Sequence, residues 1–353
     1  MLSKLYPRLP GVAAVLCLTP GFLCLTAPAA HAQIGYSETK LVADEAGKAA
    51  KTDPNLVNPW GLASLNGGDW WVSDNNSGLT TLYDGNGNIQ SLVVTIPPSS
   101  SDPTSKGSPT GCVSNPTADF GGSFFIFDSE DGTISAWFGA SSTVTQIDKG
   151  TAAVYKGLAM AAMGTVNVLY AANFRAGTVE AYDLDFNPFA LAGDAFKDPK
   201  IPAGYAPFGI QTVNGNLYVT FAKQDASKHD EIDGPGFGYV DEFDPTGMLI
   251  MRLEHVGSMN APWGIALAGS NFGQFSGDLL VGNFGSGQIA AFNPTTGKFI
   301  AVLTGSTSKP LIIPGLWALQ FGQGGDSGPT DWLYFTAGVQ NEAHGLFGFL
   351  SPL

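Results

Sequence analysis

Six copies of one short motif divide the sequence into units of nearly equal length. The motif is an apolar run around a glycine or an alanine, often preceded by a proline and an aromatic residue, as in NPWGLA and APWGIAL. Its six small residues are Gly61, Gly111, Gly157, Gly209, Gly264 and Ala318. The intervals between them are 46 to 55 residues. A repeat of this length indicates that each unit is one supersecondary structure that stacks on its neighbours.

Two further apolar runs follow the motif in each unit. In the first unit they are WWVSD and LTTLYD, and in the fifth they are LLVGNF and GQIAAF. Such short runs, rich in β-branched and aromatic residues and bounded by turn residues, are typical of strands. The segment IQSLVVTI, residues 89–96, predicts a fourth, outer strand. We therefore predict an all-β fold, a six-bladed β-propeller of four-stranded antiparallel blades.

The two ends of the chain predict how the ring closes. The sixth unit stops at Leu353 after three runs, whereas YSETKLVAD, residues 36–44, is a strand that belongs to no unit. We expect this N-terminal strand to become the outer strand of the last blade, because an open array would expose sheet edges. The linker-like segments 97–109 and 223–238 fall inside the repeat and are predicted to be loops. Residues 33–353 are therefore expected to form a single domain.

The first 32 residues have the features of a cleaved secretory signal peptide. Lys4 and Arg8 precede an apolar stretch, and the small residues of AHA, residues 30–32, offer a cleavage point. Prolines and a glycine interrupt the stretch, which argues against a membrane anchor. No later segment approaches ~20 uninterrupted apolar residues, so we expect no membrane span after cleavage and a secreted or periplasmic protein.

The remaining 321 residues are strongly acidic. Without Lys4 and Arg8, the chain has 14 basic and 30 acidic residues, a net charge of −16. Nucleic acids and anionic membranes bind clustered Lys and Arg, so we expect neither as a partner. The single remaining cysteine, Cys112, can form no internal disulfide and has the position of a small core residue. We expect a monomer that is stabilised by its core alone.

The ordered motifs resemble an uncharacterised family of secreted bacterial propellers. They include NPWGLA, PAGYAPFGIQ, APWGIAL, LLVGNFGSGQI and GLWALQFG, and the resemblance extends from Lys40 to Gly348. That family is related to NHL-repeat proteins, and its members often carry a C-terminal PEP-CTERM sorting tail. The present sequence ends in LFGFLSPL, so the resemblance implies export without such sorting. It implies no particular activity, because a propeller fold by itself names no function.

The antiparallel pattern predicts one face of the ring on which a site can form. The start of the first strand and the end of the second lie on the same face in every blade, around the mouth of the central channel. The residues predicted to bind a ligand there are Trp60, Asn75, Lys156, Asn173, Arg175, Lys223, Trp263 and Asn283. Such rings, amides and charges suit a small polar ligand, or an extracellular protein or glycan. The tryptophans could instead fill wedges between blades, and the asparagines could adopt left-handed turns.

Other residues at the mouth leave open whether the protein is an enzyme. Glu342 and His344 would face one side of an extended strand, as a catalytic base with its orienting group or as metal ligands, although a hydrogen-bonded turn would also explain them. Asp128 and Glu130 offer oxygen ligands of the type that Ca²⁺ takes, although the sequence identifies no cofactor. These residues would support a metal-assisted hydrolase or lyase, by analogy with six-bladed lactonases and streptogramin lyases.

A second acidic cluster lies in the loop DASKHDEIDG, residues 225–234. It contains Asp225, Asp230, Glu231 and Asp233 but lacks the regular spacing of an EF-hand. We therefore predict a solvated acidic loop there rather than a calcium site.

Overall fold

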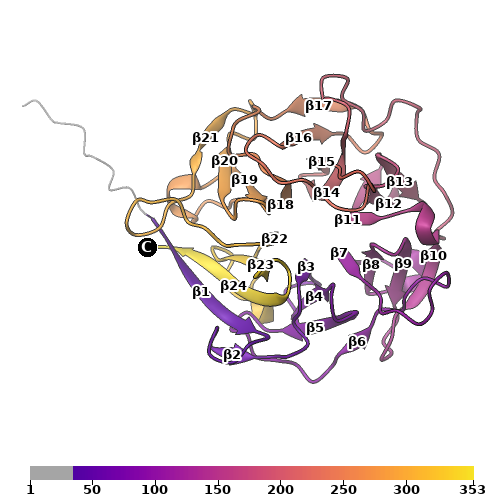
Figure 1. Ribbon diagram of the computed structural model, residues 1–353, viewed down its shortest axis with the longest axis horizontal. Coiled ribbons are helices and arrows are strands. Elements are labelled where there is room, and N and C mark those ends of the chain that lie inside the picture. Colours follow the sequence, from indigo (N-terminus) through magenta and orange to yellow (C-terminus); the bar gives the residue numbers. More distant parts are fainter. Residues whose placement is uncertain (1–34) are drawn as a thin grey trace, which may run out of the picture. The chain divides into compact units, whose positions relative to one another are not determined.

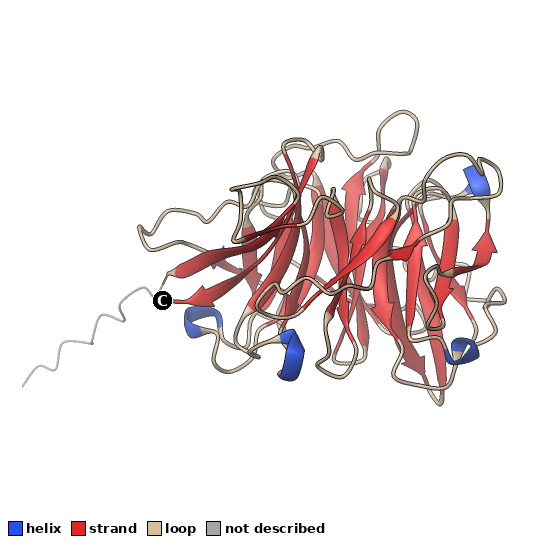
Figure 2. Cartoon of the chain, turned by 90° about the horizontal axis from the view of Figure 1, so that it is seen from below, coloured by secondary structure: helices blue, strands red, loops and turns tan. Residues whose placement is uncertain are grey.

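In the computed structural model, which describes residues 35–353, six β-sheets surround a central axis (Figure 1). The predicted signal peptide, residues 1–32, lies outside the described residues. Seen from the side, the strands run between the two faces of the ring, and short 3₁₀ helices lie in the loops (Figure 2). No helix in this part of the chain is long and apolar enough to cross a membrane. The predicted all-β, six-bladed propeller is confirmed.

Four sheets contain four antiparallel strands each, in chain order. Blade one consists of β3 (Pro59–Ser64), β4 (Trp70–Asp74), β5 (Leu79–Tyr83) and β6 (Val94–Thr95). Blade two consists of β7 (Pro109–Ser114), β8 (Phe125–Ser129), β9 (Thr133–Trp137) and β10 (Val144–Asp148). Blade four consists of β14 (Tyr205–Val213), β15 (Asn216–Lys223), β16 (Gly238–Phe243) and β17 (Leu249–Arg252). Blade five consists of β18 (Pro262–Leu267), β19 (Leu279–Asn283), β20 (Ile289–Phe292) and β21 (Phe299–Val302).

Blade three has only three strands, β11 (Tyr155–Met163), β12 (Val166–Asn173) and β13 (Thr178–Tyr182). The chain that follows β13 makes one bridge, between Tyr182 and Pro188, and Phe189 N donates to Ala181 O at 2.8 Å before the chain turns away. Pro188 cannot donate a backbone hydrogen bond, which weakens an outer strand at this point. The outer strand of blade one is also shorter than predicted, because within residues 89–96 only β6 forms a regular strand.

The N-terminal strand closes the ring, as predicted. Blade six is built from β22 (Leu316–Phe321), β23 (Leu333–Val339), β24 (His344–Pro352), β1 (Tyr36–Ala43) and the short β2 (Lys51–Thr52). Strand β1 pairs antiparallel with β24, from Tyr36 opposite Pro352 to Ala43 opposite Leu346. Figure 1 shows β1 beside β24 at the outer edge of this blade. The last blade is therefore assembled from both ends of the described chain.

The repeated glycines are required by the packing of one inner strand on the next. Gly61 of blade one lies directly against the backbone oxygen of Thr110 in blade two, and Gly264 lies against that of Trp317. A Cβ atom at either position would overlap the neighbouring backbone, so the motif recurs for a structural reason. Apolar side chains from adjacent sheets fill the space between them, as Ile126 of blade two and Leu169 of blade three do.

Candidate functional site

The strand register brings one end of every inner strand to the same face of the ring. Pro59 at the start of β3 lies opposite Asp74 at the end of β4, and Tyr155 of β11 lies opposite Asn173 of β12. The other blades have the same arrangement. We call this the mouth face.

Aromatic side chains close the centre of the mouth face. The rings of Trp60 and Trp317 stack with centroids 3.4 Å apart, Trp263 stands edge-on to Trp60 at 6.1 Å, and Phe284 stacks on Trp317 at 4.1 Å. We call this cluster the aromatic plug; its members are Trp60, Phe174, Phe208, Trp263, Phe284 and Trp317. Trp60 is only 2 % exposed, whereas Trp263 and Phe284 are half-buried. Trp60 is therefore a packing residue, and the latter two rings keep accessible surface.

The ammonium group of Lys156 lies on the aromatic plug. Its Nζ is 4.9 Å from the ring centroid of Trp60, and the side chain is 1 % exposed. It forms an ion pair with Glu130 and lies 3.5 Å from Asp230 Oδ1 and 3.9 Å from Glu231 Oε2. Burial by itself would lower the pKa of Lys156, but the three carboxylates raise it above its ordinary value. Lys156 is therefore a buried, charged ammonium held by acids from blades two and four.

The acidic loop between β15 and β16 lies at the mouth, where Asp230 and Asp233 are exposed to solvent and Glu231 is not. The backbones of Gln224 and Glu231 form an isolated antiparallel β-bridge, and Gln224 Nε2 donates to Phe174 O at 2.5 Å. Further along, Gly234 N donates to the Asn260 side chain at 2.7 Å. The prediction of a solvated loop is wrong for Glu231, whose side chain is 8 % exposed. The loop joins the second strand of blade four to the third, so the alternating strand direction alone predicts that it lies on the mouth face.

Two acids of the mouth have strongly raised pKa values. Burial raises the pKa of Glu231 to about 8, although Lys156 opposes the shift. Burial also raises the pKa of Glu342 to about 7, again against the effect of Lys156. Nearby acids add to both shifts, and Asp233 contributes to each of them. Glu231, Asp233 and Glu342 therefore form one acidic group.

We expect the folded protein to be less stable at pH 8.5 than at pH 6. The ordinary pKa of glutamate is 4.5, whereas the folded-state pKa is about 8 for Glu231 and about 7 for Glu342. Between pH 4.5 and these values, the folded protein therefore binds more protons than the unfolded chain. Stability is then lost as the pH rises through this range. Buried Asp128 and Asp241, with pKa values of about 7, act in the same direction. Thermal melting across this range tests the expectation, and the pH dependence should be shallower in Glu231→Gln; an identical dependence would contradict it.

The predicted asparagines divide into one member of the mouth network, Asn75, and two strand-end residues, Asn173 and Asn283, whose backbone is not left-handed. Asn75 Nδ2 donates to Glu130 Oε2 at 2.8 Å, which joins blade one to the acids around Lys156. Asn173 accepts from Val154 N at 3.3 Å, and Asn283 accepts from Asn260 N at 2.9 Å. The last two amides stabilise local backbone.

Three other predicted residues make contacts that do not include Lys156. Arg175 Nη1 donates to Thr151 O at 2.7 Å, and Lys223 Nζ lies 4.1 Å from the ring centroid of Phe237. Asp128 is completely buried, and its Oδ1 accepts hydrogen bonds from the inner strand of its own blade, including Gly111 N at 2.6 Å. The predicted metal pair Asp128 and Glu130 thus has its two side chains in different networks.

The side chains of the predicted catalytic pair, Glu342 and His344, also contact different parts of the molecule. The backbone at Glu342 is not extended but left-handed, with φ of 64°, so the two side chains do not share one side of a strand. His344 Nδ1 is 2.7 Å from Asp44 Oδ2, at the N-terminal strand. Glu342 instead belongs to the acidic group of the mouth. The structure shows no hydrogen bond between these two side chains among the described residues.

A different trio has the spacing of metal ligands. Glu130, His229 and Asp230 offer one ligand atom each, and these atoms lie within 4.8 Å of one another. Carboxylate and imidazole ligands suit several divalent cations. However, Lys156 already pairs with Glu130 and lies near Asp230. A metal ion here would compete with that ammonium group for two of the three ligands.

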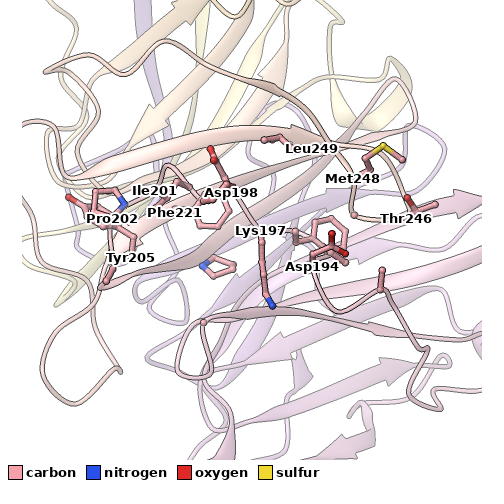
Figure 3. A pocket seen from close by; sticks show the side chains of 18 residues that line it. Asp194, Lys197, Asp198, Ile201, Pro202, Tyr205, Phe221, Thr246, Met248 and Leu249 are labelled. Atoms are coloured by element: carbon pink, nitrogen blue, oxygen red, sulfur yellow. The ribbon is translucent and has the colours of Figure 1, made fainter.

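Two cavities are relevant to ligand binding. One, of about 290 Å³, lies beside the aromatic plug and is lined by Asp233, Phe284, Pro314, Gln340 and Asn341 among others. A larger one, of about 940 Å³, lies between residues 192–205, which lead into blade four, and that blade (Figure 3). Its walls are largely apolar, and its buried Asp198 is paired with Arg252. Of the two, only the smaller cavity adjoins the aromatic plug and the acidic group.

Solved structures of proteins with different activities share this fold. The chain is similar to a streptogramin B lyase, with 12 % identity, a TM-score of 0.53, and coverage of 91 % of this chain and 98 % of that one. It is similar to a glucose dehydrogenase, with 14 % identity, a TM-score of 0.54, and coverage of 89 % and 99 %. A Bacteroides thetaiotaomicron protein of unknown function gives 11 % identity, a TM-score of 0.55, and coverage of 90 % and 76 %. At these identities the likeness concerns the fold alone.

Relatives in sequence include two proteins of Acanthamoeba polyphaga mimivirus. No protein-family model matches the chain. The chain is 32 % identical over 329 residues to uncharacterized protein R648 of Acanthamoeba polyphaga mimivirus, covering 87 % of this chain and 78 % of that protein. It is 31 % identical over 323 residues to uncharacterized protein L690 of the same virus, covering 86 % and 82 %. The chain therefore belongs to the same family as the mimivirus proteins R648 and L690, whose names state no activity.

Proposed function

We propose that this protein is a binding scaffold that holds a small polar ligand at the mouth of the ring. The observation that carries the proposal is the cavity of about 290 Å³ beside the aromatic plug. The half-buried ring of Phe284 gives it an apolar wall, and Asp233, Gln340 and Asn341 give it polar groups. Ligand sites combine apolar walls and a few polar groups in this way, and their volumes begin at about 300 Å³.

The wall of this cavity is firmly supported, which favours binding without rearrangement. Phe284 stacks on Trp317, and Trp317 Nε1 donates to Asn58 Oδ1 at 3.2 Å. Trp263 Nε1 donates to Lys156 O at 2.7 Å, which ties blade five to blade three. A ligand at Phe284 would therefore contact a surface that is already held by hydrogen bonds and stacked rings.

Phe284→Ala is expected to abolish the binding of small polar molecules. Ligand-observed NMR with a set of amines, polyols and amino acids identifies those that bind the wild-type protein. Truncating Phe284 removes the apolar wall, so their signals should return to those of the free molecules. Tyr205→Ala, which changes the larger cavity, is the matched control and should leave binding intact. Binding that survives Phe284→Ala and disappears in Tyr205→Ala would contradict the proposal; thermal melting verifies that both variants fold.

A second candidate function is a metal-assisted hydrolase or lyase. The observation in its favour is the trio Glu130, His229 and Asp230. A bound divalent cation would supply a Lewis acid or an activated water. This candidate requires the metal to compete with the ammonium of Lys156, so it predicts stronger metal binding in Lys156→Met and loss of binding in His229→Ala. Calorimetric titration of EDTA-treated protein with Ca²⁺, Mn²⁺ and Zn²⁺ tests it, and absence of binding in both the wild type and Lys156→Met would reject it.

We further propose that the protein is exported. The charged start and apolar stretch of residues 1–32 support this, as does the resemblance to secreted bacterial propellers. The expected mature N-terminus is Gln33. N-terminal sequencing of the protein from the producing cells tests the proposal, and an uncut chain in the cytoplasm would contradict it.

A further inference from the structure

The longest connection between two blades forms one wall of the cavity of about 940 Å³. This connection comprises residues 183–204, which give blade three no regular outer strand, and its residues 192–203 line the cavity. Most of the other lining residues belong to blade four (Figure 3). The volume lies within the range of about 300–1,000 Å³ that is typical of small-molecule sites.

Apolar side chains from both walls line this cavity. The connection contributes Phe196 and Ile201, and blade four contributes Tyr205, Phe221 and Leu249. The two phenylalanines are buried, whereas the other three side chains are half-buried and keep accessible surface. A ligand that removes such surface from water gains free energy in proportion to the apolar area covered. The cavity therefore favours apolar ligands.

The connection is firmly attached to the blades on both sides. Phe196 N donates to Gly247 O at 2.8 Å, and the Phe196 ring lies 5.2 Å from that of Phe243 in blade four and 5.6 Å from that of Tyr170 in blade three. The Tyr170 hydroxyl donates to Pro245 O at 2.6 Å. The walls are thus held in place by the protein itself, so a ligand would bind without ordering them.

The charged groups that line the cavity are paired or lie in solvent. The buried carboxylate of Asp198 pairs with Arg252 and accepts from Lys200 N at 2.9 Å. The exposed residues Asp194 and Lys197 carry opposite charges, and Lys197 Nζ donates to a backbone oxygen of its own segment at 2.5 Å. An ionic ligand would therefore find no unpaired buried charge among the lining residues, and its own burial would be costly.

We propose that this cavity binds a second ligand, a neutral apolar molecule that contains an aromatic ring. The ring would lie against Tyr205 and Phe221, since aromatic pairs contribute beyond the area they bury. Met248, which lines the cavity and is 66 % exposed, adds apolar surface that the ligand would cover. This site shares no lining residue with the cavity at the mouth, so the inference goes beyond the proposed function.

Two dyes with one ring system test the inference. N-Phenyl-1-naphthylamine is neutral, and 8-anilino-1-naphthalenesulfonate adds a sulfonate to the same rings. In fluorescence titrations of the whole protein, we expect the neutral dye to bind at least about tenfold more tightly, because the sulfonate would be buried without a partner. Met248→Asp and Tyr205→Ala should each weaken the neutral dye by about tenfold. Ile250→Asp is the matched control, because Ile250 is 51 % exposed on the same outer strand but does not line the cavity.

The outcomes separate this inference from the proposed function. Equal binding of the two dyes, or no binding of the neutral dye, overturns the inference. So does an equal loss in Ile250→Asp and Met248→Asp, because the dye would then bind exposed apolar surface in general. Phe284→Ala should leave the neutral dye bound, and loss of the dye in that variant would place it at the mouth and also overturn the inference. Loss in Met248→Asp and Tyr205→Ala, with melting curves that verify folding, supports it whether or not the mouth binds polar molecules.

Discussion

Deletion of residues 36–43 is expected to unfold the entire ring, not only blade six. These residues form β1, which pairs with β24 along its whole length. Its Tyr36, Leu41 and Val42 are buried, and each large apolar side chain contributes about 1.5–3 kcal/mol. Their combined loss is comparable to the total stability of a typical protein, about 5–15 kcal/mol. Urea unfolding followed by tryptophan fluorescence should show no folded baseline for the deleted protein.

A loop deletion provides the control for this experiment. Residues 103–106 are exposed and lie between blades one and two, so their removal should leave the unfolding midpoint nearly unchanged. If the protein without residues 36–43 instead unfolds at the wild-type midpoint, closure by the N-terminal strand is not what holds the ring together.

Lys156→Met is expected to destabilise the protein by about 3–5 kcal/mol at pH 8.5, the cost of leaving a buried ion pair with one partner. Methionine keeps the apolar contacts with the aromatic plug but leaves Glu130 and Glu231 without their ammonium. The loss should be smaller at pH 6, because Glu231 has a pKa of about 8 and is protonated there. Urea unfolding at the two pH values measures both effects.

Two further variants make the Lys156 result specific. The double variant Lys156→Met with Glu130→Gln should recover part of the lost stability, because the neutral amide needs no counter-charge. Lys298→Met replaces an exposed lysine near Glu254 and should have no measurable effect. A Lys156→Met protein as stable as the wild type at pH 8.5 would show that the ammonium does not compensate the acids around it.

The fold was predictable because its determinants are local and repeated. The opening glycines follow one another at nearly constant intervals, and each is needed at the same contact between inner strands. Closure by residues 36–44 was also predictable, since the sixth unit lacks an outer strand in sequence. The missing outer strand of blade three was not predicted, although Pro188 gives a local signal for it. The chain beyond Pro188 follows a path set by tertiary contacts, such as Phe196 N donating to Gly247 O at 2.8 Å.

The candidate site was predictable only in part. Lys156, Trp263, Asn75 and Glu130 meet at the mouth because strand direction alone fixes their face. The burial of Glu231 in the acidic loop was not predicted, because the conformation of the loop depends on distant partners, including Phe174 and Asn260. The left-handed backbone at Glu342 likewise arises in a turn, and no residue type in QNEAHG requires it.

The most direct test of the mouth as the binding site is a crystal structure with the tightest ligand from the NMR set. We predict that this molecule occupies the cavity of about 290 Å³, in contact with the ring of Phe284 and at hydrogen-bond distance from Asp233. A ligand found instead in the cavity of about 940 Å³, between Phe196 and Tyr205, with the mouth free of it, would contradict the account.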